Sequence, residues 1–243
     1  MRIKSTPASR SGTDVEKTEN PDPAHWRRPE LLRRLVAPAI DLLARLALDL
    51  RIVHPERLPR TGGVLIVANH VSFLDPPALY AVGHRLGRRI RFVALSDLMS
   101  VPGLGWLLRR GRTITVTRGA GAQGLLEKGR AALRAGQSVV IYPEGTIPAQ
   151  GTVATGRPGA GLLALCGEAP IVPMASSGLE RWRPHKLRLR RPAVVVVGEP
   201  LDLSRWQGRD DRRAAIEAST ALLEAIRSLQ IEGDRLLDGG GDE

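Results

Sequence analysis

Short apolar runs alternate with longer amphipathic stretches along most of the chain. The apolar runs predict buried strands, and they fall at residues 64–68, 91–95, 113–117, 138–142, 171–175 and 193–197, with 187–190 as a further candidate. The stretches between them predict helices, and these fall at 76–86, 104–110, 120–135, 159–166 and 210–231. Strands that alternate with helices indicate an α/β domain, in which a mostly parallel central sheet is flanked by helices.

One stretch near the start of the chain, residues 31–50, has an unusually wide apolar surface. At about 100° per residue, its charged side chains fall on one face of a helix, and leucine, valine, isoleucine and alanine cover the rest. The charged residues are Arg33, Arg34, Asp41, Arg45 and Asp49. We therefore expect an N-terminal amphipathic helical segment over 26–50, bent or divided at Pro38. It can pack on the domain core, lie in a membrane interface, or do both with different sides.

The regions on either side of these elements are polar. Residues 1–25 and 236–243 are expected to be disordered, which leaves 51–235 for the main α/β domain. Residues 1–30 contain no apolar run long enough for the core of a signal peptide. Nowhere do about 18 apolar residues follow one another without interruption. We therefore expect neither a signal peptide nor a transmembrane helix.

The composition is ordinary except for its high net positive charge. Hydrophobic residues make up 42% and charged residues 25%, as in an ordinary globular protein. Lys and Arg outnumber Asp and Glu by 36 to 25, for a net charge of +11, which attracts polyanions such as nucleic acid, anionic lipid headgroups or phosphorylated substrates. Aromatic residues are only 3%, which disfavours base stacking, and no zinc-finger or RNP pattern occurs. The single cysteine, Cys166, excludes an internal disulfide and a four-cysteine zinc site.

The strongest candidate for chemistry is the block Asn69-His70-Val71-Ser72-Phe73-Leu74-Asp75. It follows a predicted strand, and ligands of α/β sheets gather beyond the carboxyl ends of strands. A carboxylate five residues after His70 can fix one nitrogen of the imidazole, so that the other nitrogen faces the site as a base. Asp75 also precedes Pro76, so it fits a helix N-cap that has no catalytic role.

Three further motifs follow strands or flank them. Glu144 stands in a Tyr-Pro-Glu-Gly-Thr block after the strand at 138–142, where a plain turn would also fit. Arg112 and Arg118 flank the strand at 113–117, and each can bind phosphate or lie in solvent. Pro173 interrupts the strand at 171–175, which is typical of an edge or entry position. No Gly-x-Ser-x-Gly motif is present and Cys166 has no motif around it, so a covalent serine or cysteine mechanism lacks support.

In this order and spacing the motifs resemble those of the glycerophospholipid acyltransferase family, and most closely the bacterial 1-acylglycerol-3-phosphate (lysophosphatidic acid) acyltransferases. The likeness runs over about 57–198. The Asn-His-x-Ser-x-x-Asp block of the family falls on Asn69, His70, Ser72 and Asp75, and its glycine-to-arginine block falls on Gly111, Ile114, Val116 and Arg118. Its aromatic-Pro-Glu-Gly-Thr block falls on residues 142–146, and its Val/Ile-Pro block on residues 171–173.

The resemblance implies a membrane-associated O-acyltransferase, with 51–235 as its acyltransferase domain. His70 would act as the general base, oriented by Asp75, in moving an acyl group from acyl-CoA or acyl-carrier protein to 1-acylglycerol-3-phosphate, which gives phosphatidic acid. The acceptor headgroup would be lined by Arg118, Glu144, Gly145 and Thr146, and the site would be supported by Asn69, Ser72, Gly111, Arg112, Arg157 and Pro173. No metal or other cofactor is implied. We expect no nucleic-acid partner, and a peripheral or monotopic position at the anionic cytoplasmic face of the cell membrane.

Two positions depart from the pattern of members that use lysophosphatidic acid. Ile147 stands where these members usually have arginine, and Leu95 lies near a common lysine. Because a buried phosphate without a cation is costly, either Arg112, Arg118 or Arg157 compensates, or the acceptor is not a glycerol phosphate. The alternatives are therefore the same chemistry on another lyso-lipid or a specialised hydroxyl acceptor, and, from a different class, a non-catalytic protein that binds anionic lipid or nucleic acid.

Overall fold

The computed structural model describes residues 30–147, 156–181, 190–206, 208–209 and 211–239. The terminus at 1–25, expected to be disordered, and most of the candidate strand at 187–190 lie outside these ranges. In the described residues seven strands form one sheet in the order β1-β7-β6-β2-β5-β3-β4. They are β1 (Leu48–Val53), β2 (Val64–Ala68), β3 (Ile90–Leu95), β4 (Ile114–Val116), β5 (Ser138–Ile141), β6 (Ile171–Ser177) and β7 (Arg191–Val197).

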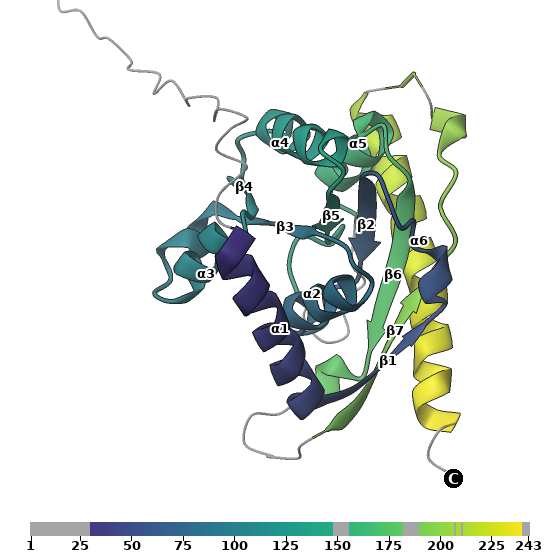
Figure 1. Ribbon diagram of the computed structural model, residues 1–243. Helices are drawn as coiled ribbons and strands as arrows, with labels where there is room; N and C mark the ends of the chain where they lie inside the picture. Colours follow the sequence, from purple (N-terminus) through teal and green to yellow (C-terminus); the bar gives the residue numbers. More distant parts are fainter. Residues whose placement is uncertain (1–29, 148–155, 182–189, 207, 210, 240–243) are drawn as a thin grey trace, which may run out of the picture.

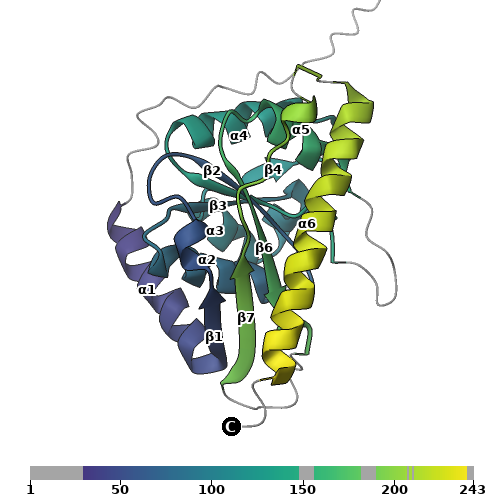
Figure 2. The same cartoon turned by 90° about the vertical axis from the view of Figure 1, so that its right-hand side faces the viewer.

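Helices cover both faces of this sheet (Figures 1 and 2). Side chains from α4 (Gln123–Arg134), α5 (Pro158–Cys166) and α6 (Arg212–Asp238) pack on one face, and side chains from α2 (Asp75–Arg85) pack on the other. α1 (Glu30–Ala47) lies against α2, and α3 (Leu104–Arg110) lies near β4 at the sheet edge. Every pair of neighbouring strands is parallel except β6 and β7. The predicted fold class, a mostly parallel sheet flanked by helices, is confirmed.

The central strand β2 shows why the apolar runs form buried strands. All five of its residues are buried, and successive side chains point to opposite faces. Leu65 and Val67 join the core under α4, α5 and α6, while Val64 and Ile66 join the core under α2. A parallel strand covered on both faces reads as a continuous apolar run rather than as an alternating one.

The N-terminal segment differs from its prediction. The helix ends at Ala47, and residues 48–53 form β1, which pairs in parallel with β7 at the sheet edge. The expected boundary between residues 50 and 51 therefore falls inside a strand. Pro38 lies within α1, which continues through it as one helix rather than two.

Two further differences concern the end of the chain and the central proline. α6 continues to Asp238, so residues 236–238 are helical rather than part of a disordered tail, and residues 240–243 lie outside the described ranges. Pro173 lies in β6, which has a neighbour on each side, and not at an edge. The proline is tolerated there because the ladder with β7 begins only at Met174, while Gly198 N–H donates to the Pro173 carbonyl at 2.8 Å.

Candidate functional site

The site begins at the carboxyl end of β2, where the chain turns into α2. His70 lies in this turn, and its Nδ1 is 3.0 Å from Oδ2 of Asp75. The Asp75 side chain is fully buried, whereas the His70 side chain is 18% exposed. The imidazole is therefore held from the inside of the molecule and still reaches the surface.

The turn itself is organised around the carboxylate of Asp75. Its Oδ2 also accepts hydrogen bonds from the backbone N–H groups of Val71 and Ser72, each at 2.7 Å. The Ser72 hydroxyl accepts from Leu74 N–H at 3.2 Å. Asp75 is thus the first residue of α2 and not its N-cap, which is Leu74. Its carboxylate ties the loop together and orients His70 with the same oxygen.

Asn69 fixes the preceding residue to the neighbouring strand. Its Nδ2 donates to the Ser176 carbonyl at 2.9 Å, and its Oδ1 accepts from Ser176 N–H at 2.8 Å. Both residues are buried. This reciprocal pair connects the ends of β2 and β6, so the loop that carries His70 leaves the sheet from a fixed point.

The end of β5 meets the same loop from the other side. Glu144 Oε2 accepts the backbone N–H of His70 at 2.8 Å. The ring of Tyr142 stacks on the imidazole, with centroids 4.3 Å apart and planes 16° from parallel. β2 and β5 are neighbours in the sheet, which is why two motifs about 70 residues apart in the sequence come into contact. From the sequence, Glu144 was expected to line the acceptor headgroup, and no role was expected for Tyr142.

Glu144 has an unusual electrostatic position. Burial raises its pKa to about 7, with a smaller contribution in the same direction from the charge of Asp75. The hydrogen bond from His70 N–H, and the charges of His70 and of Arg227 on α6, act in the opposite direction and limit the rise. Arg227 was not among the residues predicted from the sequence.

Gly145, Thr146 and Arg157 lie together next to Glu144. Gly145 has a φ of +71°, and a Cβ there would lie 3.0 Å from Cγ of Arg157. Arg157 N–H donates to the Pro143 carbonyl at 2.7 Å, and its Nε donates to the Glu144 carbonyl at 3.4 Å. Thr146 and Arg157 are exposed. The structure therefore brings one predicted cation, Arg157, to the Glu144 turn.

The predicted residues around β4 lie elsewhere on the sheet. Gly111 ends α3, Arg112 precedes β4 with a φ of +53°, and Arg118 follows β4 as an exposed residue. β5 and β3 lie between β4 and β2, the strand that precedes the His70 turn. A cation that sequence reasoning overlooked, Arg91 on β3, is buried near Arg112, and burial, with the charge of Arg112, lowers its pKa to about 10.

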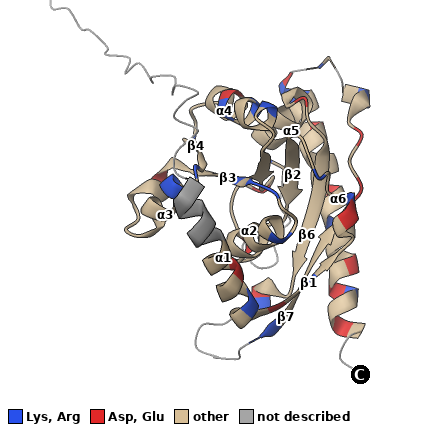
Figure 3. Ribbon diagram, viewed as in Figure 1, with Lys and Arg blue, Asp and Glu red and all other residues tan. Residues whose placement is uncertain are grey.

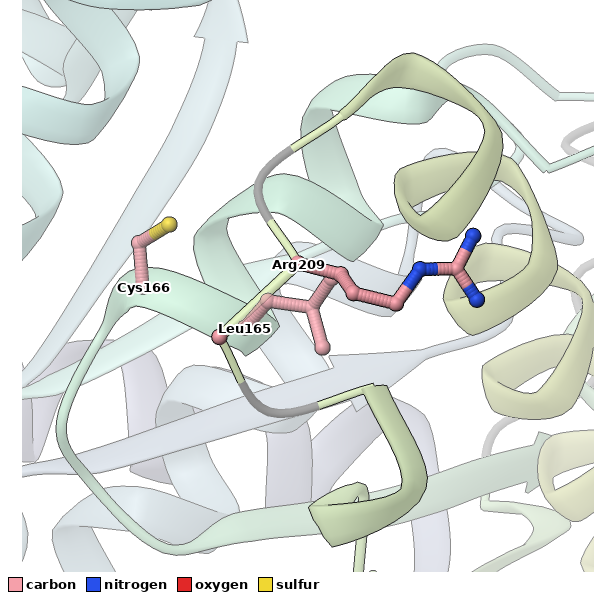
Figure 4. A pocket seen from close by; sticks show the side chains of 4 residues that line it. Leu165, Cys166 and Arg209 are labelled. Carbon is pink, nitrogen blue, oxygen red and sulfur yellow. The ribbon is translucent and has the colours of Figure 1, made fainter.

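Two surface hollows lie away from these residues. One, shown in Figure 4, is lined by Leu165, Cys166, Gly208 and Arg209 at the end of α5. The other is lined by residues of the 3-10 turn Ser204–Trp206 and of α6. His70 and Glu144 line neither of them. Within the described ranges, no group of three or more His, Cys, Asp or Glu side chains is arranged to hold a metal ion.

The sheet order and the His70–Asp75 pair define an α/β protein with an imidazole–carboxylate site at the end of a central strand. Residues 49–177 match the family model described as Acyltransferase. The chain belongs to the acyltransferase family.

Two relatives that the chain matches are named as acyltransferases of lipids. It is 35% identical over 84 residues to a lyso-ornithine lipid O-acyltransferase of Pseudomonas aeruginosa, covering 34% of this chain and 31% of that protein. It is 28% identical over 146 residues to human 1-acyl-sn-glycerol-3-phosphate acyltransferase beta, covering 59% and 51%. The chain thus spans about a third of the length of the first relative and about half of the length of the second.

A solved structure shares the fold. The crystal structure of the 1-acyl-sn-glycerophosphate (LPA) acyltransferase PlsC from Thermotoga maritima matches with a TM-score of 0.58 and 21% identity. The match covers 82% of this chain and 83% of that one. It therefore includes most of the described sheet and helices.

Proposed function

We propose that the protein transfers a fatty acyl group from an acyl thioester to the free hydroxyl of a lyso-lipid, with 1-acylglycerol-3-phosphate as the first candidate acceptor and phosphatidic acid as the product. The observation that carries the proposal is the 3.0 Å contact between His70 Nδ1 and the buried carboxylate of Asp75. With Nδ1 occupied, Nε2 is the nitrogen left to act on a substrate. The family to which the chain belongs supports the reaction class.

The mechanism follows from these two side chains. His70 Nε2 removes the proton of the acceptor hydroxyl as its oxygen attacks the thioester carbonyl carbon. Asp75 stabilises the imidazolium that forms, because an opposite charge at hydrogen-bond distance favours the charged ring. When the tetrahedral intermediate collapses, its C–S bond breaks and the leaving thiolate takes the proton from Nε2. The imidazole is then neutral again, and no acyl-enzyme forms.

The donor and the cofactor requirement belong to the proposal as well. Either acyl-CoA or acyl-carrier protein provides the thioester, and the basic net charge of +11 suits both because both are anionic. The mechanism uses no metal or prosthetic group. Both donors are cytoplasmic molecules, so we place the reaction at the cytoplasmic face of the cell membrane.

A second acceptor class has its own support. Ile147 follows the Glu144 turn, at the position where the resemblance predicts an arginine for a phosphate-bearing acceptor. A phosphate there would depend on Arg157, whose Nε donates to the Glu144 carbonyl. One relative takes its name from a lyso-ornithine lipid. A lyso-aminolipid is therefore the alternative acceptor, with unchanged chemistry at His70.

An acceptor comparison tests the two classes. Purified protein on mixed liposomes receives palmitoyl-CoA together with lysophosphatidic acid, lyso-ornithine lipid or an uncharged lyso-lipid, and thiol release is followed. We expect release that requires lysophosphatidic acid and falls at least tenfold in Arg157→Gln. Release with lyso-ornithine lipid alone would assign the alternative. If no acceptor supports release with either CoA or carrier-protein donors, the acyltransferase proposal is wrong.

We also propose that an anionic bilayer surface is the protein's partner, and α1 provides the first support. α1 is attached through its polar side, because Asp41 is buried and accepts from Arg85 of α2 at 2.6 Å and from Arg45 at 2.8 Å. Burial alone would raise the pKa of Asp41, but these bonds outweigh it and lower that pKa. Leu42, Leu43 and Leu46 point outward, and Leu43 is 64% exposed.

Among the described residues, no helix combines the length and apolarity needed to cross a membrane.

A second apolar surface lies on α3 and on the 3-10 turn Ser96–Ser100 before it. This α3 surface consists of Leu98, Val101, Leu104, Trp106 and Leu107, all exposed. Arg110 lies 5.4 Å from the centroid of the Trp106 ring, and basic residues of α3 are visible in Figure 3. Tryptophan with arginine beside it suits the headgroup level of a bilayer. Phe73, in the His70 loop, is 87% exposed.

Two negative charges introduced on the α3 surface by substitution are expected to weaken membrane binding. The double variant Trp106→Glu/Leu107→Glu removes apolar side chains and adds repulsion from anionic lipid, so partitioning should fall tenfold or more. Co-sedimentation with phosphatidylcholine vesicles containing phosphatidylglycerol measures it. Ile231→Glu is the matched control, because Ile231 is an exposed apolar residue on α6. Equal binding of the double variant and the wild type would contradict a role for α3.

A further inference from the structure

His70 is held by more than Asp75. The carboxylate of Asp75 contacts Nδ1 of the imidazole. From the end of β5, the Tyr142 ring stacks on the imidazole and the Glu144 carboxylate accepts the backbone N–H of His70. We infer that Tyr142 and Glu144 are positioning residues, which fix the plane and the backbone of His70 for the proposed acyl transfer. The inference rests on that proposed function for its kinetic consequences, but not for the contacts themselves.

The contact with Tyr142 restricts the rotation of the His70 imidazole that its hydrogen bond to Asp75 still allows. A single hydrogen bond at Nδ1 allows the imidazole to swing about that bond, which moves Nε2 sideways. A ring stacked with centroids 4.3 Å apart blocks that swing on one side. The Tyr142 ring is itself buried and lies 6.5 Å from the nearly parallel ring of Phe92. It therefore provides a rigid wall rather than a mobile one.

The hydroxyl of Tyr142 is not what fixes its place. It is buried, and within the described residues it has no hydrogen-bond partner. Burial raises the pKa of Tyr142 well above its ordinary value, with further contributions from Asp75 and Glu144, so the hydroxyl stays protonated and neutral. The ring is therefore the part that acts on His70, and phenylalanine should replace it well.

Glu144 acts on the backbone and on the charge. Its Oε2 accepts a hydrogen bond from the His70 backbone N–H, and the charges of Glu144 and His70 attract each other. At a pH above its pKa of about 7, Glu144 is mostly ionised and stabilises the imidazolium that forms during transfer, in addition to Asp75. A positioning role for Glu144 differs from a role in acceptor binding, because loss of positioning lowers the rate of the chemical step and leaves the acceptor affinity nearly unchanged.

Substitution of Tyr142 separates a positioning role from core packing. Tyr142→Leu should lower kcat by about 10–100-fold with KM for the acceptor changed less than about threefold, since small misplacements of a reacting group are costly. Tyr142→Phe should keep kcat within about threefold, because the ring remains. Phe92→Leu is the matched control, since it removes the next ring of the same stack without touching His70. Equal kcat losses in Phe92→Leu and Tyr142→Leu would overturn the role of Tyr142.

Substitution of Glu144 separates positioning from acceptor binding. Glu144→Gln keeps an oxygen for the His70 N–H but removes the charge, so kcat should fall about tenfold at nearly constant KM. A raised KM with unchanged kcat would make Glu144 an acceptor-binding residue instead.

A measurement without turnover keeps the inference apart from the proposed function. The NMR signals of the His70 imidazole and backbone N–H are compared in the wild type, Tyr142→Leu and Glu144→Gln. We expect the backbone N–H signal to shift in Glu144→Gln, because its acceptor changes from a carboxylate to an amide, and the ring-current shift of the imidazole to be lost in Tyr142→Leu. Unchanged signals in both variants would overturn the inference even if acyl transfer is confirmed. Changed signals in a protein without acyl transfer would support the contacts and reject only the reaction.

Discussion

Replacement of His70 by alanine is expected to lower acyl transfer by about 10²–10⁴-fold, the range typical for loss of a general base. The fold should survive, because Asp75 keeps its bonds to Val71 and Ser72 N–H when the imidazole is removed. Glu144 also keeps its bond to the backbone N–H of residue 70. Thiol release from palmitoyl-CoA on liposomes measures the activity, and thermal unfolding measures the stability.

The matched control is His84→Ala, which removes a histidine near the end of α2, away from the turn that holds His70. This variant should transfer acyl groups as the wild type does. Comparable activity in His70→Ala and the wild type would show that another group removes the hydroxyl proton.

The second large effect is expected for Asp75→Asn. One oxygen of asparagine can accept the three donors that Asp75 Oδ2 now accepts. The amide nitrogen then takes the place of Oδ1, which is buried and has no partner in the described part of the chain. An unsatisfied buried donor costs about 1–3 kcal/mol, so the free energy of unfolding should fall by that amount. Activity should fall on the order of 10²-fold or more, because the imidazolium loses its stabilising charge.

Asp49→Asn provides the comparison for this variant. Asp49 lies on the edge strand β1 and its side chain is 69% exposed, so neither stability nor activity should change measurably. Denaturant unfolding and thiol release are measured on both variants. Activity of Asp75→Asn within a few-fold of the wild type would mean that the carboxylate orients the loop but does not assist the base.

The sequence predicted β2 to β7 closely, including the edge strand β4, and missed β1 at the other edge. The apolar runs at β2, β5 and β7 stand out because successive residues in them are buried. β1 was missed because its leucines continue the apolar spacing of α1, so one pattern covers a helix and a strand. Nothing local marks the change at Ala47; the pairing with β7, about 140 residues later, determines it.

In the site, too, contacts within one turn could be predicted from the sequence, whereas contacts between strands could not. His70 and Asp75 share one turn, so their spacing alone predicted the contact that the structure contains. The contact of Glu144 with His70 depends on β2 and β5 being neighbours, which no local pattern indicates. Arg118 and Glu144 were grouped around one acceptor, yet β3 lies between β4, which precedes Arg118, and β5, which precedes Glu144. Strand order, rather than motif spacing, decides which of the predicted residues meet.

The way α1 is attached determines how the protein behaves when no lipid is present. Its leucines then face water, and the apolar surface most readily available to them is that of another copy. Repulsion between basic surfaces opposes such pairing at low ionic strength, and salt screens the repulsion within about 10 Å at 0.1 M. Self-association should therefore increase with salt and with concentration, and anionic vesicles should reverse it. The amount of active enzyme in a sample would then depend on the competition between copies and bilayer for the same leucines.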